Sequence, residues 1–137
     1  MRKGITTLYA GLALLVATLV LVQFFLAGLG WFDPSVGFDA HESVGFILHG
    51  ITLLVFLLAI AGPRTRQDIL MSLALLVLAT IQISLPDLRD DAPVIAAFHP
   101  LLALVIGGLA HAIGRRYIGG RGRASAAPAG GTGPYAR

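Results

Sequence analysis

The chain has 137 residues, of which 56% are hydrophobic and 12% charged, and its mean hydropathy is +0.83. This composition excludes an ordinary soluble domain and favours a small membrane protein. The lack of cysteine excludes disulfides, iron–sulfur clusters and thiolate metal sites. The net charge of +3 comes from basic residues that flank apolar runs, so it does not indicate nucleic-acid binding.

Four runs of the chain contain no Asp, Glu, Lys or Arg. A helix that crosses a bilayer needs about 20 residues, and slightly shorter runs also suffice. The runs do not alternate polar with apolar residues, as the strands of a membrane barrel do. The sequence therefore predicts an all-α fold with four transmembrane helices, at about residues 5–31, 43–62, 68–85 and 93–115.

The first run begins after Lys3 and ends with Trp31 and Phe32. The apolar region of a signal peptide is only about 7 to 15 residues long, so this run is better interpreted as a retained anchor helix. Tyrosine and tryptophan are enriched where a span meets the headgroups, and we expect Tyr9, Trp31 and Tyr117 to be interfacial anchors.

The charges indicate the orientation of the spans. Nine of the ten basic residues lie at the N-terminus, between the second and third runs, or after the fourth, and six of the seven acidic residues lie in the other two connections. Only Arg89 and Asp68 depart from this pattern. Because Lys and Arg are retained on the cytoplasmic side, we expect a multi-pass protein of the cytoplasmic membrane with both termini inside. Short connections favour an up-down-up-down bundle.

The composition changes near residue 117. Residues 117–137 are rich in Gly, Ala and Pro with scattered Arg, and they can bury almost no apolar surface. We therefore expect one monomer-capable transmembrane domain at residues 1–116 and a disordered basic tail at residues 117–137.

Strongly hydrogen-bonding side chains gather in the predicted outer third of the spans. His49 lies about 9 Å below the start of the second span, and His99 about 9 Å below the start of the fourth. Gln23 and Gln82 lie at a similar level on the first and third spans. Polar residues in a bilayer are costly, so this shared level indicates a site.

The surroundings of His99 support this interpretation. Pro100 has no N–H to donate to the carbonyl of Ala96, so we expect a bend and a free carbonyl that accepts from the His99 ring. Ala96, Ala103 and Gly107 form a stripe of small residues on the same side of the helix, which lets another helix or a flat cofactor approach closely.

The specific hypothesis is haem b, with His49 and His99 as axial ligands to its iron and Gln23 and Gln82 as supporting residues around them. Such a centre serves electron transfer with a membrane redox partner. We expect His41, beside Glu42, to be solvated at the outer interface. Two alternatives remain open. The polar residues can form a structural network in a non-catalytic accessory subunit, or they can mark a proton or cation pathway.

The sequence shows no serine–histidine–carboxylate set at one depth, no HExxH motif and no Gly-rich phosphate loop. This favours a protein that is not an enzyme. Its expected surroundings are the lipid bilayer and a redox partner or larger membrane complex, with no nucleic acid.

The stretch His-Glu-Ser-Val-Gly-Phe-Ile-Leu-His-Gly at residues 41–50, the triplet Phe98-His99-Pro100 and the four short spans carry a resemblance. Over roughly residues 5–115 the chain resembles a family of small bacterial four-span membrane proteins of unknown function. The paired histidines are similar in outline to those of membrane b-type cytochromes. The family resemblance implies the topology and no activity.

Overall fold

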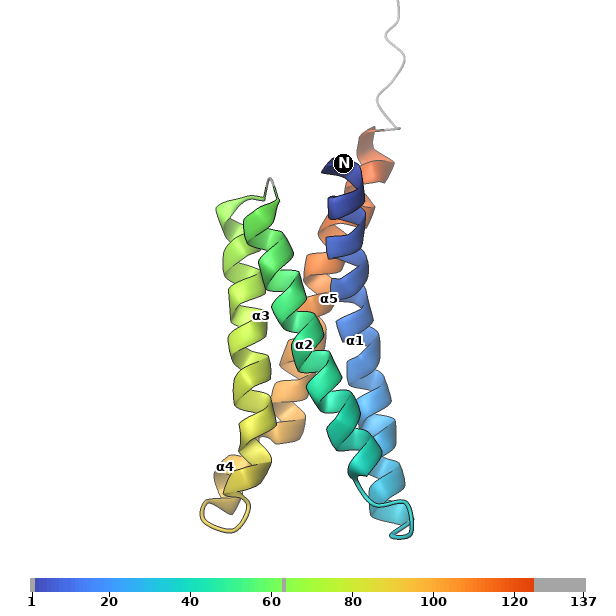
Figure 1. Cartoon of the computed structure of the whole chain (residues 1–137), viewed down its shortest axis with the longest axis vertical. Helices are drawn as coiled ribbons and strands as arrows, with labels where there is room; N and C mark the ends of the chain where they lie inside the picture. Colours follow the sequence, from blue (N-terminus) through green and yellow to red (C-terminus); the bar gives the residue numbers. More distant parts are fainter. Residues whose placement is uncertain (1, 63, 125–137) are drawn as a thin grey trace, which may run out of the picture.

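The computed structural model describes residues 2–62 and 64–124, and this part of the chain is helical, with no β-strand. Figure 1 shows the order of the elements, which are α1 (Arg2–Phe32), α2 (Asp39–Ala61), α3 (Arg66–Ser84), η1 (Leu85–Leu88), α4 (Pro93–Ala96) and α5 (His99–Ala124). Four candidate membrane spans occur in these residues: Gly4–Phe32, Asp39–Ala61, Arg66–Leu88 and Pro93–Ile118. The prediction of an all-α, multi-pass membrane protein is confirmed.

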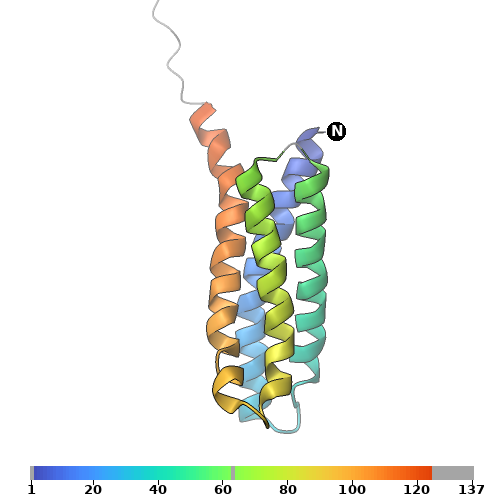
Figure 2. The same cartoon turned by 90° about the vertical axis from the view of Figure 1, so that its left-hand side faces the viewer.

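The long helices form an up-down-up-down bundle in which each packs against its neighbours in a ring. Helix α1 contacts α2 and α5, and α3 contacts the same two helices. Figures 1 and 2 show the start of α1, the α2–α3 connection and the end of α5 at one end of the bundle. We call this the basic end, because it carries Arg64, Arg66, Arg115 and Arg116. The opposite, acidic end carries Asp33, Asp39, Glu42, Asp87, Asp90 and Asp91.

Two helix starts differ from the expected ones. Helix α2 begins at Asp39 instead of residue 43 and takes Asp39 and Glu42 into its first turn, where the helix dipole favours negative charge. The fourth span is broken: α4 ends at Ala96, and α5 begins at His99. The break follows from Pro100, which cannot donate to the Ala96 carbonyl. Helix α4 packs against η1, and α5 is a separate helix that starts at His99.

Helix α5 also ends later than expected for the fourth helix, at Ala124 instead of near residue 115. The residues after 115 include Arg116 and Tyr117, whose side chains are bound to α3 and so hold this turn in helical form. The rest of the predicted tail, residues 125–137, lies outside the described residues.

The basic half of the bundle is tightly packed. Its fully buried side chains include Val16, Val55, Leu75, Ile106 and Ile113. Tyr9 is also completely buried and hydrogen-bonds Ser72 at 2.8 Å, so it is a core residue and not the interfacial anchor expected from its position. Trp31, at 77% exposure, lies where an interfacial anchor would.

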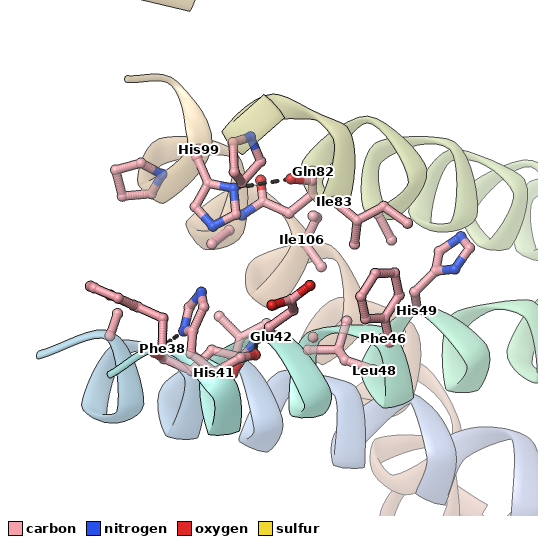
Figure 3. A pocket seen from close by; sticks show the side chains of 18 of the residues that line it. Phe38, His41, Glu42, Phe46, Leu48, His49, Gln82, Ile83, His99 and Ile106 are labelled. Carbon is pink, nitrogen blue, oxygen red and sulfur yellow. Dashed lines mark hydrogen bonds between the residues drawn. The ribbon is translucent and has the colours of Figure 1, made fainter. Parts of the chain in front are cut away.

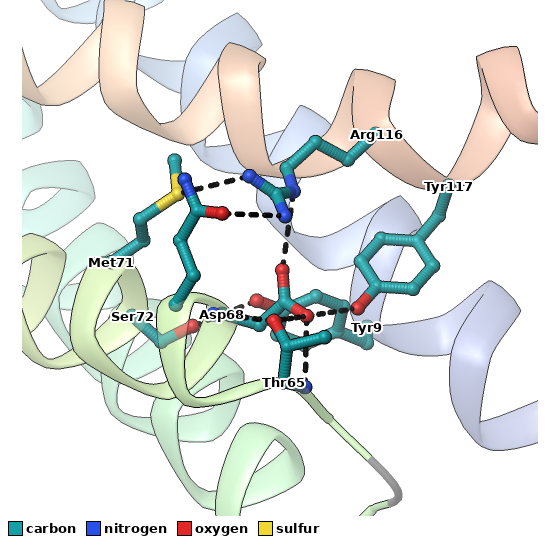
Figure 4. Close-up of polar contacts among 8 residues, drawn as sticks. Tyr9, Thr65, Asp68, Met71, Ser72, Arg116 and Tyr117 are labelled. Atoms are coloured by element: carbon teal, nitrogen blue, oxygen red, sulfur yellow. Dashed lines mark hydrogen bonds and ion pairs between the residues drawn. The ribbon is translucent and has the colours of Figure 1, made fainter.

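Asp68, the acidic residue outside the acidic end, is 2% exposed and joins three segments at the basic end. Its carboxylate accepts hydrogen bonds from the Thr65 backbone N–H at 3.1 Å and the Tyr117 hydroxyl at 2.7 Å, and it pairs with Arg116 Nε at 3.2 Å (Figure 4). Thr65 and Asp68 form a capping box at the start of α3. The carboxylate therefore ties the ends of α3 and α5 together.

Arg64 connects α1 to the same cluster. Its guanidinium lies 4.4 Å from the ring centre of Tyr9 and 4.6 Å from that of Tyr117. It also donates to Thr6 Oγ1 at 3.3 Å and to the Ile5 carbonyl at 3.4 Å. Cation–π contacts are stronger where water is excluded. Polar contacts as well as apolar packing therefore hold the helices together at this end of the bundle.

Close contact between α1 and α5 explains the small residues on α5. A Cβ added to Gly107 would lie 3.2 Å from Val20 Cγ1, and one added to Gly114 would lie 2.5 Å from Leu14 Cγ. The stripe that includes Gly107 therefore accommodates another helix, one of the two uses predicted for it. Such approach is how small residues stabilise helix pairs in membranes.

We expect Gly114→Ala to destabilise the protein by about 1–3 kcal/mol, because the new methyl group forces α1 and α5 apart. Gly108→Ala is the matched control, since a Cβ there meets no heavy atom of the described chain within 4 Å. Unfolding in mixed detergent–SDS micelles measures both free energies. An equal response of the two variants would contradict the packing described for Gly114.

We expect Asp68→Ala to lower the free energy of unfolding by about 3 kcal/mol, since it leaves Arg116 and Tyr117 without their shared partner. Asp91→Ala, at the exposed acidic end, should change it by less than about 0.5 kcal/mol. The same unfolding titration compares the two. A loss at Asp68 no larger than that at Asp91 would show that the basic-end cluster contributes little to stability.

Candidate functional site

A cavity of about 810 Å³ opens at the acidic end, bounded by all four long helices. Its walls are largely apolar, with Phe24, Phe46 and Ile83 among them. The polar groups that line it include three histidines and two glutamines, namely His41, His49, His99, Gln23 and Gln82. Cavities with apolar walls and a few convergent polar groups are typical of ligand sites.

The rings of His41 and His99 face each other across this cavity (Figure 3). Their centres are 6.0 Å apart and their planes are inclined by 54°. His41 Nδ1 lies 3.1 Å from the Gln23 carbonyl oxygen, and His99 Nδ1 lies 3.0 Å from the Gln82 carbonyl oxygen. A carbonyl oxygen only accepts, so each Nδ1 carries the hydrogen, and in the neutral ring each Nε2 keeps a free lone pair.

A proline explains why the Gln82 carbonyl is available to His99. In an uninterrupted helix this oxygen would accept from the backbone nitrogen of residue 86, but that residue is Pro86 and has no N–H. We expected Pro100 to free the Ala96 carbonyl for the His99 ring. The His99 ring instead bonds the carbonyl that Pro86 leaves free, because the break after Ala96 turns α4 away toward η1.

Gln23 holds His41 from two sides. In addition to its carbonyl contact with the ring, its side-chain Nε2 donates to the His41 carbonyl at 2.9 Å. Gly45, one turn further along α2, makes room for this amide, since a Cβ there would lie 2.9 Å from Gln23 Nε2. The side-chain oxygens Gln23 Oε1 and Gln82 Oε1 are buried and have no hydrogen-bond partner within the described residues.

His49 has a different partner and the opposite tautomer. Its Nε2 lies 3.0 Å from Thr80 Oγ1, and the Thr80 hydroxyl donates its own hydrogen to the Leu76 carbonyl at 2.9 Å. The Thr80 oxygen can then only accept, so His49 Nε2 must carry the hydrogen. This nitrogen is engaged with α3 and is not free to bind an iron.

His99, Gln23 and Gln82 line the same cavity, but the ring beside His99 belongs to His41. His49 lies eight residues after His41, about 12 Å further along α2. The predicted equal depth of His49 and His99 was counted from residues 43 and 93, whereas the helices start at Asp39 and His99. Counted from these starts, His41 and His99 are both in the first turn. His41 is half-buried and bonded, and the expectation that it is merely solvated was wrong.

Three carboxylates and one arginine complete the polar lining. Glu42, Asp87 and Asp90 line the cavity, and Arg89 lies 3.7 Å from Asp90, with both side chains largely exposed. The rim therefore has a negative balance and attracts cations. Across residues 2–62 and 64–124, no group of three His, Asp or Glu side chains is placed to hold a metal ion by itself.

Nuclear magnetic resonance can test the assigned tautomers. Under alkaline conditions that keep the rings neutral, long-range ¹H–¹⁵N spectra should show Nδ1–H for His41 and His99 and Nε2–H for His49. Thr80→Val removes the acceptor of His49 and should alter only that ring, while the exposed His111 serves as an unconstrained reference. An Nε2–H form of His41 or His99 would rule out the carbonyl contacts.

Comparisons with known proteins agree with the predicted resemblance. Residues 23–86 match a family of unknown function (DUF6220). This segment runs from Gln23 to Pro86 and so includes His41, His49 and Gln82, while His99 lies outside it. No curated protein and no solved structure matches the chain. The match confirms the resemblance of this four-span membrane protein to a family whose function is unknown.

Proposed function

We propose that the protein is a membrane-bound metal-binding protein that holds its centre between the Nε2 atoms of His41 and His99. The observation that carries this proposal is that each Nδ1 is bonded to a backbone carbonyl of a neighbouring helix. Metal-ligating histidines almost always donate their other ring N–H in this way, which fixes the tautomer and the ring orientation. Two such rings face one cavity here.

The spacing of the rings also suits a shared ion. Nitrogen–metal distances of about 2.0–2.1 Å place two imidazole centres about 6 Å apart when the rings bind opposite sides of one ion. The observed separation of the His41 and His99 ring centres is 6.0 Å.

A purely structural network explains the site less well. The described residues leave Gln23 Oε1, Gln82 Oε1 and, at the basic end, Arg64 Nε without a partner. Of these three atoms, only the two amide oxygens belong to residues that line a cavity large enough for a ligand. A continuous cation pathway is also less favoured. The cavity ends against Val20, Leu48, Ala79 and Ile106, which belong to the buried core.

Two sources can supply the metal: the iron of haem b or a free transition-metal ion. Haem b was the hypothesis for His49 and His99, and with His41 in place of His49 it remains a candidate whose role would be electron transfer to a membrane partner. A free ion needs as ligands only the Nε2 lone pairs of His41 and His99 together with water molecules. In either case the protein binds and does not catalyse.

The charge pattern supports the orientation of this site. Arg64, Arg66, Arg115 and Arg116 lie together at the basic end. Since Lys and Arg are retained in the cytoplasm, this end and both termini belong inside the cytoplasmic membrane. The cavity then opens to the outside, where its acidic rim meets incoming cations.

A binding experiment on the chelator-stripped, tag-free protein in detergent tests the proposal. Titration with Zn²⁺ by calorimetry and with haem b by absorbance should reveal one centre per chain in at least one of the two. His41→Ala and His99→Ala should weaken binding by more than about 100-fold, because even outer-shell changes cost about 10- to 100-fold.

His111→Ala is the matched control and should bind as the native protein does, because His111 is exposed on α5 and does not line the cavity. Loss of haem binding in His49→Ala and His99→Ala, with unchanged binding in His41→Ala, would instead support His49 and His99, the ligand pair predicted from the sequence. Failure of both Zn²⁺ and haem b to bind would reject the proposed function.

A further inference from the structure

Only the imidazoles of His41 and His99 face each other in the site, and this restricts the kind of centre it can hold. Zinc takes four ligands, and other transition-metal ions commonly take four to six. In the described part of the chain no third His, Asp or Glu completes a set around His41 and His99. A free ion bound here must keep several water molecules, whereas haem would bring its own four nitrogens.

The two unpartnered amide oxygens distinguish these cases. Gln23 Oε1 and Gln82 Oε1 are buried acceptors on the same residues whose carbonyls hold the histidine rings. Exchanging the Gln23 amide atoms does not help, because its oxygen would then face the His41 carbonyl oxygen. An unsatisfied buried acceptor costs about 1–3 kcal/mol, so a ligand that donates hydrogen bonds to both oxygens is favoured.

Water bound to a metal ion is such a donor. The face of a porphyrin offers no hydrogen-bond donor, and its propionates are acceptors with negative charge. They would meet Glu42, Asp87 and Asp90 at the rim, where Arg89 is already paired with Asp90. Figure 3 shows the Glu42 side chain directed into the cavity between the helices. The lining therefore favours a metal cation whose water ligands donate hydrogen bonds over a haem with negatively charged propionates.

From these contacts, and resting on the proposed function, we infer that the centre is a hydrated divalent transition-metal ion. His41 and His99 bind it directly through Nε2. Its water ligands donate to Gln23 Oε1 and Gln82 Oε1, and the carboxylates of the rim attract it from solution. Imidazole nitrogens suit Zn²⁺, Cu²⁺ and Ni²⁺, which defines the class of ligand.

Cu²⁺ is the probe that tests this inference, because its electron paramagnetic resonance reports the bound atoms. Copper-loaded protein in lipid nanodiscs should show couplings from two imidazole nitrogens and, after transfer to D₂O, loss of signals from exchangeable water protons. Gln23→Leu and Gln82→Leu should each weaken Cu²⁺ binding by about 10- to 100-fold while the two-nitrogen signal persists at saturation.

Two further variants serve as controls. Gln82→Glu keeps an acceptor of the same shape and should bind Cu²⁺ at least as tightly as the native protein does. Gln67→Leu removes a glutamine at the basic end, where it accepts from Arg116 at 3.1 Å, and should leave Cu²⁺ affinity unchanged.

The outcomes separate the inference from the proposed function. Native affinity in both leucine variants, absence of exchangeable protons, or binding of haem alone would overturn the hydrated ion, while the dependence on His41 and His99 would still support a metal centre. Loss of dependence on these histidines, or binding of neither Cu²⁺, Zn²⁺ nor haem, would overturn both.

Discussion

The hydrogen bond between His99 and the Gln82 carbonyl is the contact on which the acidic end of the bundle depends. In a bilayer almost every backbone group must find its partner within the protein, because no water is available to replace it. Pro86 deprives the Gln82 carbonyl of its helical donor, and a histidine from the next span supplies one. This bond joins the end of α3 to the start of α5, next to the break between α4 and α5. It also fixes the tautomer of His99 and leaves its Nε2 lone pair available, which is the basis of the proposed metal site.

The two ends of the bundle solve the problem of buried polar groups differently. At the basic end, Asp68, Arg116, Tyr117 and Thr65 satisfy one another, and Arg64 is enclosed by aromatic rings. Of these groups, only Arg64 Nε lacks a hydrogen-bond partner in the described residues. At the acidic end the lining is acceptor-rich, and two amide oxygens lack partners in the described residues. The basic end therefore holds the helices together, whereas the acidic end contains the proposed site.

Small residues help to explain why the basic end is held together tightly while the acidic end of the same bundle contains a cavity. Gly107 and Gly114 bring α1 and α5 together toward the basic end, and Gly45 admits the Gln23 side chain between α1 and α2 near the acidic end. Close approach of helices in membranes relies on packing and hydrogen bonds, since lipid tails provide no hydrophobic drive for association. The glycines thus set where the helices touch and, indirectly, where they leave a cavity.

Several features followed from the sequence by itself. Length, hydropathy and the placement of arginines and carboxylates determined the four spans and the two chemically different ends, because the bilayer imposes its thickness and its exclusion of charge on any chain. The break before Pro100 was also predictable, since its missing N–H removes a bond from a helix interior. The partner of the His99 ring was not predictable in the same way, because the ring bonds the Gln82 carbonyl instead of the Ala96 carbonyl. Gln23, Gln82 and His99, which the sequence placed at a similar depth on their spans, all line one cavity.

Only the tertiary structure decided the rest. Whether His41 or His49 lies opposite His99 depends on where α2 and α5 begin, because the four residues by which α2 starts earlier than expected correspond to about 6 Å along the helix axis. The partner of Asp68 lies 49 residues away and becomes a neighbour only when α5 packs beside α3. The tautomers of the histidines likewise depend on carbonyls and hydroxyls of other helices. Composition and periodicity constrain each helix separately, whereas these contacts are properties of how the helices meet.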